Sequence, residues 1–322
     1  MLFFVPRKSL DTARWNAFVA NSPQNIMYGY AWYLDIVCPR WEAIVQTDEA
    51  GRWQAVFAVP LRQKYGFWVV HQPLFCQFLP VFSLPHPDVP PQFDAFWKAI
   101  KNRFWYVSIL NVPHWLGGKK TNFAPVRNNL VLQLGGSYAQ IRGKYSADRE
   151  RNLVKAQKSN WQIDESQDLE PLIGMFKANH AHLMQNGVSE KAYGILRRLY
   201  AEANAQNLAL LCYAKGDGKT EAGALFWVSG QRIIYIFNAA TKHGRAANAR
   251  TIIIDKLFQQ KAGQNLLFDF ESPEKSSVAD FYRSFGATPE AHVALRYNKF
   301  PVLERVFRFL NPRKTKPNAS GI

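Results

Sequence analysis

The sequence predicts an α/β protein made of two similar units, in which helices pack on mixed, hairpin-rich sheets. Three observations lead to this prediction. Short apolar runs bounded by turn residues indicate strands, apolar residues at three- and four-residue spacing indicate helices, and a helix, helix, hairpin, helix order occurs twice. We expect residues 1–135 to form the first unit and residues 136–322 the second, with the boundary near Gly135 and Gly136.

The first unit is expected to begin with two helices, continue into a sheet and return through a third helix. Helical spacing covers residues 11–19, 28–37 and 91–102. The segment 41–75 indicates strands joined at Gly51 and Gly66, and the proline-rich segment 82–92 indicates a loop. A long connection then leads to the apolar run 129–134.

The second unit repeats this order. We expect helices over 138–142, 146–159, 169–179 and 190–204, strands over 209–214, 222–229 and 232–238, a helix over 249–261, a strand over 266–270 and a helix over 278–285. Ser146 is placed to cap the N-terminus of its helix, because a serine hydroxyl accepts from a free N–H of the first turn.

The composition of the 322-residue chain is that of a folded, globular protein. Hydrophobic residues make up 48% of it, enough for sizeable cores. The three cysteines lie far apart and the histidines show no ligand spacing, so we expect neither a disulfide scaffold nor a metal site. The N-terminus lacks signal-peptide features and no apolar run approaches the roughly 20 residues of a membrane span, so we expect a cytoplasmic protein.

The charge is strongly positive, at 40 − 24 = +16. Such an excess favours RNA, anionic lipid headgroups or a phosphorylated substrate as partner, and a merely solvated basic surface is the alternative. The sequence contains no GxSxG, GxxxxGK[ST], GxGxxG or HExxH motif. Hydrolase, nucleotide-kinase and dinucleotide-binding functions therefore lose their usual support.

Two acidic residues end the expected strand 266–270. Asp269 and Glu271 lie where ligands gather in α/β proteins, so they are placed to take a proton from an attacking amine. Alternatively, they cap the next helix or pair with surface cations.

The following stretch carries a resemblance to a known family. Ala279, Tyr282 and Gly286 are similar to the A-x-x-Y-x-x-x-G pattern of GNAT acyltransferases, and FDFES with FYRSFGA resembles the FemABX-like tandem-GNAT branch more closely. YSADRERNLVKA is similar to the basic helix that opens the second unit of that branch. The stretches SPQNIMYGYAWYLDIVCPRWEAIV and KYGFWVVHQPLFCQFLPVFS resemble its first unit, so the likeness covers nearly the whole chain.

This resemblance implies two GNAT-like units with a substrate groove between them, and transfer of an acyl or aminoacyl group to an amine. Acyl-CoA or aminoacyl-tRNA would be the donor, and a small-molecule or cell-envelope precursor amine the acceptor. Asp269 or Glu271 would accept the proton, and Tyr282 would protonate the departing group. A non-catalytic module for an anionic ligand and a CoA-dependent small-molecule N-acetyltransferase remain as alternatives.

The phosphate-binding loop of the family is only partly matched. GNAT units place R/Q-x-x-G-x-G/A at a helix start, where backbone N–H groups face the pyrophosphate. Here Gly244 and Ala246 match, but Thr241 replaces the first residue. Lys242, Arg245 and Arg250 are the cations available to hold phosphates, and a plain glycine-containing loop is the alternative.

Further candidates for substrate binding come from basic and aromatic residues. Between residues 142 and 158 six cations face two acids, a net of +4. We expect the substrate-binding residues to be Arg149, Arg151, Asn152, Lys155 and Arg283 in the second unit, with Trp32, Tyr33 and Lys64 in the first. A solvated basic face and an aromatic core are the respective alternatives.

The C-terminal stretch 300–314 has helical apolar spacing, and residues 296–316 hold seven cations against one acid. We expect this helix to dock on the protein body or to lie on an anionic inner-membrane surface.

Overall fold

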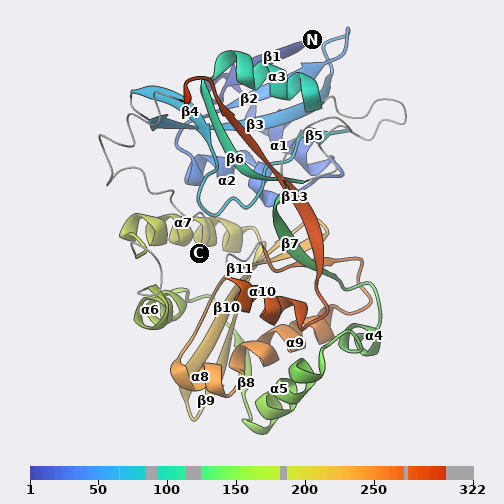
Figure 1. The fold of residues 1–322 in the computed structure, drawn as a ribbon, viewed down its shortest axis with the longest axis vertical. Helices are drawn as coiled ribbons and strands as arrows, with labels where there is room; N and C mark the ends of the chain where they lie inside the picture. Colours follow the sequence, from blue (N-terminus) through green and yellow to red (C-terminus); the bar gives the residue numbers. More distant parts are fainter. Residues whose placement is uncertain (65, 85–92, 114–124, 182–186, 272–274, 302–322) are drawn as a thin grey trace. The chain divides into compact units, whose positions relative to one another are not determined.

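The computed structural model describes residues 1–64, 66–84, 93–113, 125–181, 187–271 and 275–301 (Figure 1). By its internal contacts the chain divides into unit 1, which is Met1–Asn128 with the described residues 291–301, and unit 2, which is Asn129–Glu290. The boundary predicted at 135–136 falls inside unit 2. Residues 291–301 were expected in the second unit, but they belong to unit 1, where the last described strand, Thr288–Asn298, pairs with the strand Tyr106–Pro113.

Unit 1 is built on a mixed sheet. Its strands follow the order β1 (Leu2–Pro6), β2 (Trp41–Thr47), β3 (Trp53–Lys64), β4 (Phe67–His71), β6 (Tyr106–Pro113) and β13 (Thr288–Asn298), with β5 (Phe82–Ser83) beside β3. β4 and β6 are parallel, and the other neighbours are antiparallel. A parallel pair needs a crossover, and here α3 (Phe93–Arg103) lies within it.

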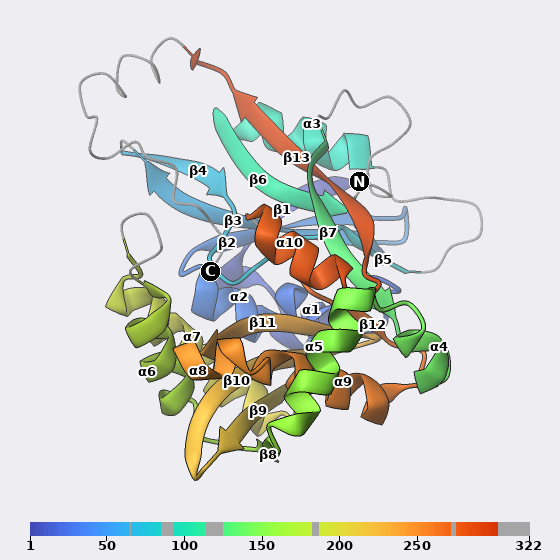
Figure 2. The same ribbon diagram turned by 60° about the horizontal axis from the view of Figure 1, so that its bottom comes forward.

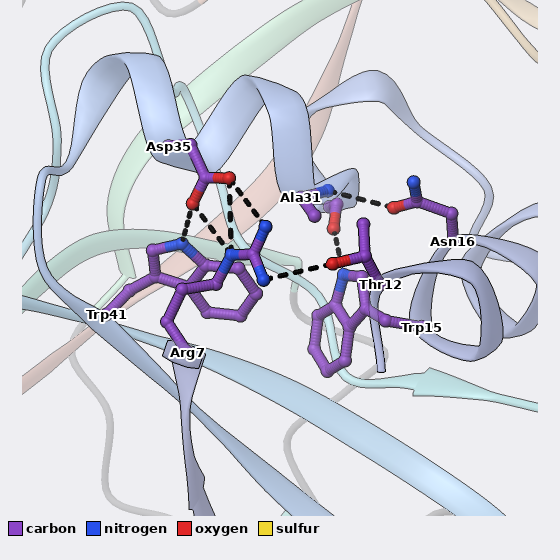
Figure 3. A network of polar contacts seen from close by, with 8 residues as sticks. Arg7, Thr12, Trp15, Asn16, Ala31, Asp35 and Trp41 are labelled. Carbon is purple, nitrogen blue, oxygen red and sulfur yellow. Dashed lines mark hydrogen bonds and ion pairs between the residues drawn. The ribbon is translucent and has the colours of Figure 1, made fainter. Parts of the chain in front are cut away.

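The two N-terminal helices of unit 1, α1 (Thr12–Ala20) and α2 (Ala31–Val37), are tied to the sheet by the polar network in Figure 3. Asp35 on α2 accepts from the Arg7 guanidinium at 2.8 Å and from the Trp41 indole at 2.8 Å. Burial alone would raise the pKa of Asp35, but these hydrogen bonds outweigh it and lower the pKa. The carboxylate therefore stays charged and holds helix, turn and strand together.

Unit 2 repeats the mixed arrangement. Its strands follow the order β7 (Pro125–Gln133), β12 (Leu267–Asp269), β11 (Arg232–Ala240), β10 (Lys219–Ser229), β9 (Ala209–Gly216) and β8 (Gln162–Glu165). Its helices are α4 (Tyr138–Arg142), α5 (Ala147–Lys158), α6 (Glu170–Asn179), α7 (Glu190–Ala205), α8 (Lys242–Ala246), α9 (Ala249–Lys261) and α10 (Ser276–Arg283). β11 and β12 are parallel, with α8 and α9 between them in the chain. Figure 2 shows α5 and α9 beside each other.

A β-bulge in β11 changes which residues face α9. Leu225 of β10 pairs with Phe237 and the next residue, Phe226, pairs with Tyr235, so Ile236 has no partner in the ladder. Because side chains alternate along a strand, the extra residue brings Tyr235 and Asn238 to the same face. Phe237 points the other way and packs on Phe176 of α6, with ring centroids 4.7 Å apart.

Many elements agree with the sequence prediction. The helices over 138–142 and 249–261 are confirmed at both ends, and the Ser146 hydroxyl accepts from the Arg149 N–H as predicted. α2 begins later than expected because residues Met27–Gly29 form a 3-10 turn. Among the described helices, none combines the length and apolar content needed to cross a bilayer. Apart from its first residues, the predicted C-terminal helix lies outside the described residues.

Candidate functional site

The first element of the site is a buried arginine without a carboxylate partner. α5 buries Arg149, Leu153 and Ala156, which share one helical face. The Arg149 Nε donates to Ser284 Oγ at 2.9 Å and its Nη1 donates to Thr251 Oγ1 at 2.5 Å. Only 4% of the residue is exposed, and burial lowers the pKa of its guanidinium to about 10. It forms no ion pair with any described residue.

Two aromatic rings flank this guanidinium. Its carbon lies 4.4 Å from the ring centroids of both Phe281 and Phe285. A cation over an aromatic face is stabilised by the ring quadrupole, and more so when water is excluded. Hydroxyls and rings thus solvate Arg149 without neutralising it.

A second arginine, Arg250, lies near the Phe281 ring. The Arg250 guanidinium is 5.3 Å from the Phe281 centroid, and its Nη1 donates to Asn238 Oδ1 at 2.9 Å. Arg250 occupies the first turn of α9, which contains no acidic residue. A cation there opposes the helix dipole, whose N-terminal end is positive. Like Arg149, Arg250 has no carboxylate partner in the described chain, so the two charges together favour an anion.

Two phenols complete the cluster. Tyr235 and Tyr282 have ring centroids 6.2 Å apart and are 2% and 8% exposed. Burial raises the pKa of Tyr235 to about 12, against the effect of the Arg250 charge. Burial also raises the pKa of Tyr282, and Tyr235 and Glu271 add to that rise. Both phenols therefore keep their protons at neutral pH and are hydrogen-bond donors. We call Arg149, Arg250, Tyr235, Tyr282 and Phe281 the arginine cluster.

Asp269 lies in an ion-pair network at the end of β12. It is fully buried, its Oδ2 accepts from Arg232 at 2.6 Å, and its Oδ1 accepts from the Glu271 backbone N–H at 2.8 Å. Arg232 also donates to Glu290 at 2.9 Å, and the Asn129 amide donates to Glu290 at 3.1 Å. Both oxygens of Asp269 are thus used within the protein. Glu271 is half-buried.

The predicted phosphate loop is packed against β10. A Cβ on Gly244 would clash with the Glu221 carbonyl oxygen, so close approach of the two backbones requires glycine here. The Gly244 N–H donates to Thr241 Oγ1, and the Thr241 hydroxyl donates to the Glu221 carboxylate. A negative charge already lies at the start of α8. Lys242, Arg245 and Ala246 are exposed, and Arg245 donates to the Ala240 carbonyl.

The other predicted binding residues of unit 2 do not join the arginine cluster by any described contact. Arg151 and Lys155 are exposed and Asn152 is half-buried, because they lie off the buried face of α5. Arg151 pairs with Asp148, and Arg283 is exposed and pairs with Asp280 at 3.0 Å. Within the described ranges, no three His, Cys, Asp or Glu side chains gather closely enough to hold a metal ion.

In unit 1 the predicted residues occupy two places. Tyr33 is buried on α2, where its hydroxyl donates to the Phe75 carbonyl and its ring packs on Trp32 with centroids 5.3 Å apart. Lys64 ends β3, with its ammonium 4.1 Å from the Tyr106 ring centroid.

Sequence reasoning missed Tyr235, Asn238, Thr251 and Ser284. The bulge that turns Tyr235 and Asn238 to one face depends on pairing with a distant strand and leaves no local pattern. One signal was present: Arg250 opens a helix whose first turn has no acid, and such a cation indicates a missing counter-charge.

Solved structures share this fold. FemX superposes with a TM-score of 0.65 at 11% identity, covering 92% of this chain and 98% of that one. The chain has the FemX fold. The predicted fold class, two GNAT-like α/β units of the FemABX-like type, is thereby confirmed.

Two further structures with the FemX fold match over similar lengths. The C-terminal domain (DUF2156) of a putative lysylphosphatidylglycerol synthetase from Agrobacterium fabrum has a TM-score of 0.57 at 10% identity, covering 94% of this chain and 97% of that one. L-PGS from Bacillus licheniformis has a TM-score of 0.53 at 11% identity, covering 95% and 98%. No protein-family model matches the sequence, and no curated protein matches it.

Proposed function

We propose that this protein transfers an aminoacyl group from aminoacyl-tRNA to an amine, and that the arginine cluster holds the anionic donor. The observation that carries the proposal is the pair of arginines around Phe281, which meet two protonated phenols but no carboxylate. The fold supports a transferase, because FemX and a lysylphosphatidylglycerol synthetase domain share it. The name of the latter indicates attachment of a lysyl group to phosphatidylglycerol.

The arginines would bind and orient the donor. A guanidinium fork suits phosphate oxygens, and Arg250 has donors left beyond its bond to Asn238. Arg149 is fixed by Ser284 and Thr251, so its charge would be preorganised to stabilise negative charge that develops on the carbonyl oxygen.

The reaction would form a C–N bond and break the ester C–O bond of the donor. The attacking amine loses a proton, and the departing ribose oxygen gains one. Tyr282 is suited to supply that proton because its phenol stays protonated at neutral pH. Of the two predicted carboxylates, Glu271 is the better proton acceptor, since it is half-buried near Tyr282 whereas Asp269 is fully buried and ion-paired with Arg232.

The start of α8 favours tRNA over CoA as donor. A CoA pyrophosphate would need backbone N–H groups there, but the Gly244 N–H is bonded to Thr241 and the Glu221 carboxylate lies against that hydroxyl. Two like charges at one helix start repel each other. Arginine side chains rather than a glycine loop would therefore recognise the phosphate.

Equilibrium binding measurements test whether the donor is aminoacyl-tRNA. We expect the wild-type protein to bind aminoacyl-tRNA and to bind acetyl-CoA much more weakly. Arg250→Gln should weaken tRNA binding about tenfold or more, because a charge-assisted hydrogen bond contributes about 1.5–3 kcal/mol. The matched control is Arg198→Gln, which removes the same charge from an exposed position on α7.

Release of aminoacyl groups to added amines, followed with the same variants, tests catalysis. Preference for acetyl-CoA, or equal binding by the Arg250 and Arg198 variants, would contradict the proposal. Donor binding without any transfer to a panel of amines would instead support a non-catalytic module.

A further inference from the structure

One end of the unit 1 sheet exposes aromatic rings. Phe67 and Trp68 open β4 and are 61% and 37% exposed, and Phe300, two residues beyond β13, is 44% exposed. Trp105 lies between them, with centroid distances of 5.5 Å to Phe67 and 6.3 Å to Phe300. Trp68 follows Phe67 on β4, so the two rings point to opposite faces at the same end of the sheet. We call Phe67, Trp68, Trp105, Tyr106 and Phe300 the aromatic edge. Large apolar side chains gathered at a surface mark an interaction site.

Cations cover the faces of these rings. The Arg40 guanidinium lies 4.1 Å from the Trp68 centroid, the Lys64 ammonium 4.1 Å from the Tyr106 centroid, and the Lys299 ammonium 5.9 Å from the Phe300 centroid. The described segments 62–64, 66–68, 104–106 and 296–300 contain no Asp or Glu, and Glu42, two residues after Arg40, is paired with Arg103 at 2.7 Å. The edge is thus both apolar and positively charged, and its partner must be anionic with an apolar interior.

We propose that the aromatic edge docks on an anionic phospholipid bilayer. The Phe67 ring would enter the boundary between headgroups and acyl chains, with Phe300 on its own side of this sheet end and Trp68 on the opposite face. Lysine and arginine stems run along apolar surface while their charges reach the phosphates. Each such cation near an anionic membrane adds to binding, and the attraction falls with salt.

The geometry favours a bilayer over a single-stranded nucleic acid. Base stacking needs free ring faces. Here Arg40 and Lys64 already cover the faces of Trp68 and Tyr106, and Phe67 meets Trp105 at an interplanar angle of 79°. The exposed parts of these rings are therefore their edges, with the cations close by. Apolar edges beside positive charges suit anionic lipid headgroups.

Vesicle co-sedimentation of the full chain tests the proposal. We expect binding to vesicles of phosphatidylglycerol and phosphatidylcholine that weakens as salt rises, and little binding to phosphatidylcholine alone. Phe67→Ser with Trp68→Ser should lower the partition coefficient about tenfold or more, because the buried apolar area is lost. Lys64→Gln with Lys299→Gln should lower the partition coefficient by roughly tenfold, because two positive charges are lost. This second double variant keeps the test valid if the Phe67 and Trp68 double variant misfolds.

The matched controls are Phe3→Ser, which removes a ring on β1 that is 42% exposed, and Lys8→Gln with Lys219→Gln, which remove two exposed lysines elsewhere. Both should bind vesicles like the wild type. Equal vesicle binding by the edge variants and their controls would overturn the proposal. If the edge variants lost tRNA binding but kept vesicle binding, the edge would be assigned to nucleic acid and the proposal would also be overturned. If they lost self-association instead, the edge would be assigned to a second copy of the chain. Vesicle binding is read without any transfer assay, so its outcome is independent of the proposed catalysis.

Discussion

Arg149 is an unusual residue for the buried face of a helix, because removing a guanidinium from water costs free energy. Two hydroxyls and two rings offset part of that cost, but none of them carries a negative charge. If the side chain at position 149 served packing alone, an apolar residue there would make the folded protein more stable. The cation is therefore best explained by a ligand that supplies the missing charge.

Asp255 on α9 provides a second buried charge with a different partner set. It is 3% exposed, and its carboxylate accepts from the Tyr138 hydroxyl and the Tyr145 hydroxyl, each at 2.9 Å. Burial raises the pKa of Asp255, and these two hydrogen bonds only partly counter that rise. The neutral form is thus favoured more in the folded than in the unfolded protein.

Asp255→Asn should change how stability depends on pH. Because the folded pKa is raised, the Asp255 contribution is full below the unfolded pKa and is lost as pH rises through the folded pKa. The unfolding free energy of wild type minus that of the variant should fall by about 1.4 kcal/mol for each pH unit between the unfolded and folded pKa values, and then stay level. Urea unfolding at a series of pH values measures it. A difference that does not vary with pH would show that the pKa of Asp255 is the same in the folded and unfolded protein, and would contradict the raised pKa.

At the scale of elements, the joint between β11 and β12 depends on Asp269 and Arg232. Asp269→Asn should lower the unfolding free energy by about 3 kcal/mol, because it leaves part of a buried cation uncompensated. Glu170→Gln is the matched control: its pair with Arg197 is exposed and contributes under about 1 kcal/mol. Urea unfolding compares the two. Wild-type stability of the Asp269 variant would mean that this carboxylate has no structural role and would make it a candidate proton acceptor again.

The elements that sequence predicted well are those whose signal is local. α9 and α4 show their apolar spacing and ends within their own residues, and Ser146 caps α5 by contact with its first turn. β8 was missed because the run QIDE at the sheet edge is polar and only half-buried. β13 was missed because its pairing with β6 joins residues far apart in the chain.

Part of the candidate site was also readable from the sequence. Arg149, Arg250 and Tyr282 came from a basic helix and a resemblance, and the structure brings all three around Phe281 and Tyr235. The basic run did not reveal which of its cations is buried, since charge counting ignores helical phase.

At the scale of the whole molecule, the charge of +16 is not spread over solvated surface alone. Cations gather among the described residues in the arginine cluster of unit 2 and at the aromatic edge of unit 1. Their surroundings differ, since the first is buried among phenols and hydroxyls and the second is exposed among rings. We infer that they serve different anions, a donor phosphate and a lipid headgroup.

Urea unfolding with and without aminoacyl-tRNA, on the wild type and on Arg149→Met, tests the central claim most directly. We predict that the variant is as stable as the wild type without tRNA or more stable by about 1–2 kcal/mol. Added tRNA should stabilise the wild type and have much less effect on the variant, because only the folded wild type gains the bound anion. A variant that is strongly destabilised, yet is stabilised by tRNA as much as the wild type, would show that Arg149 serves the fold and not a ligand.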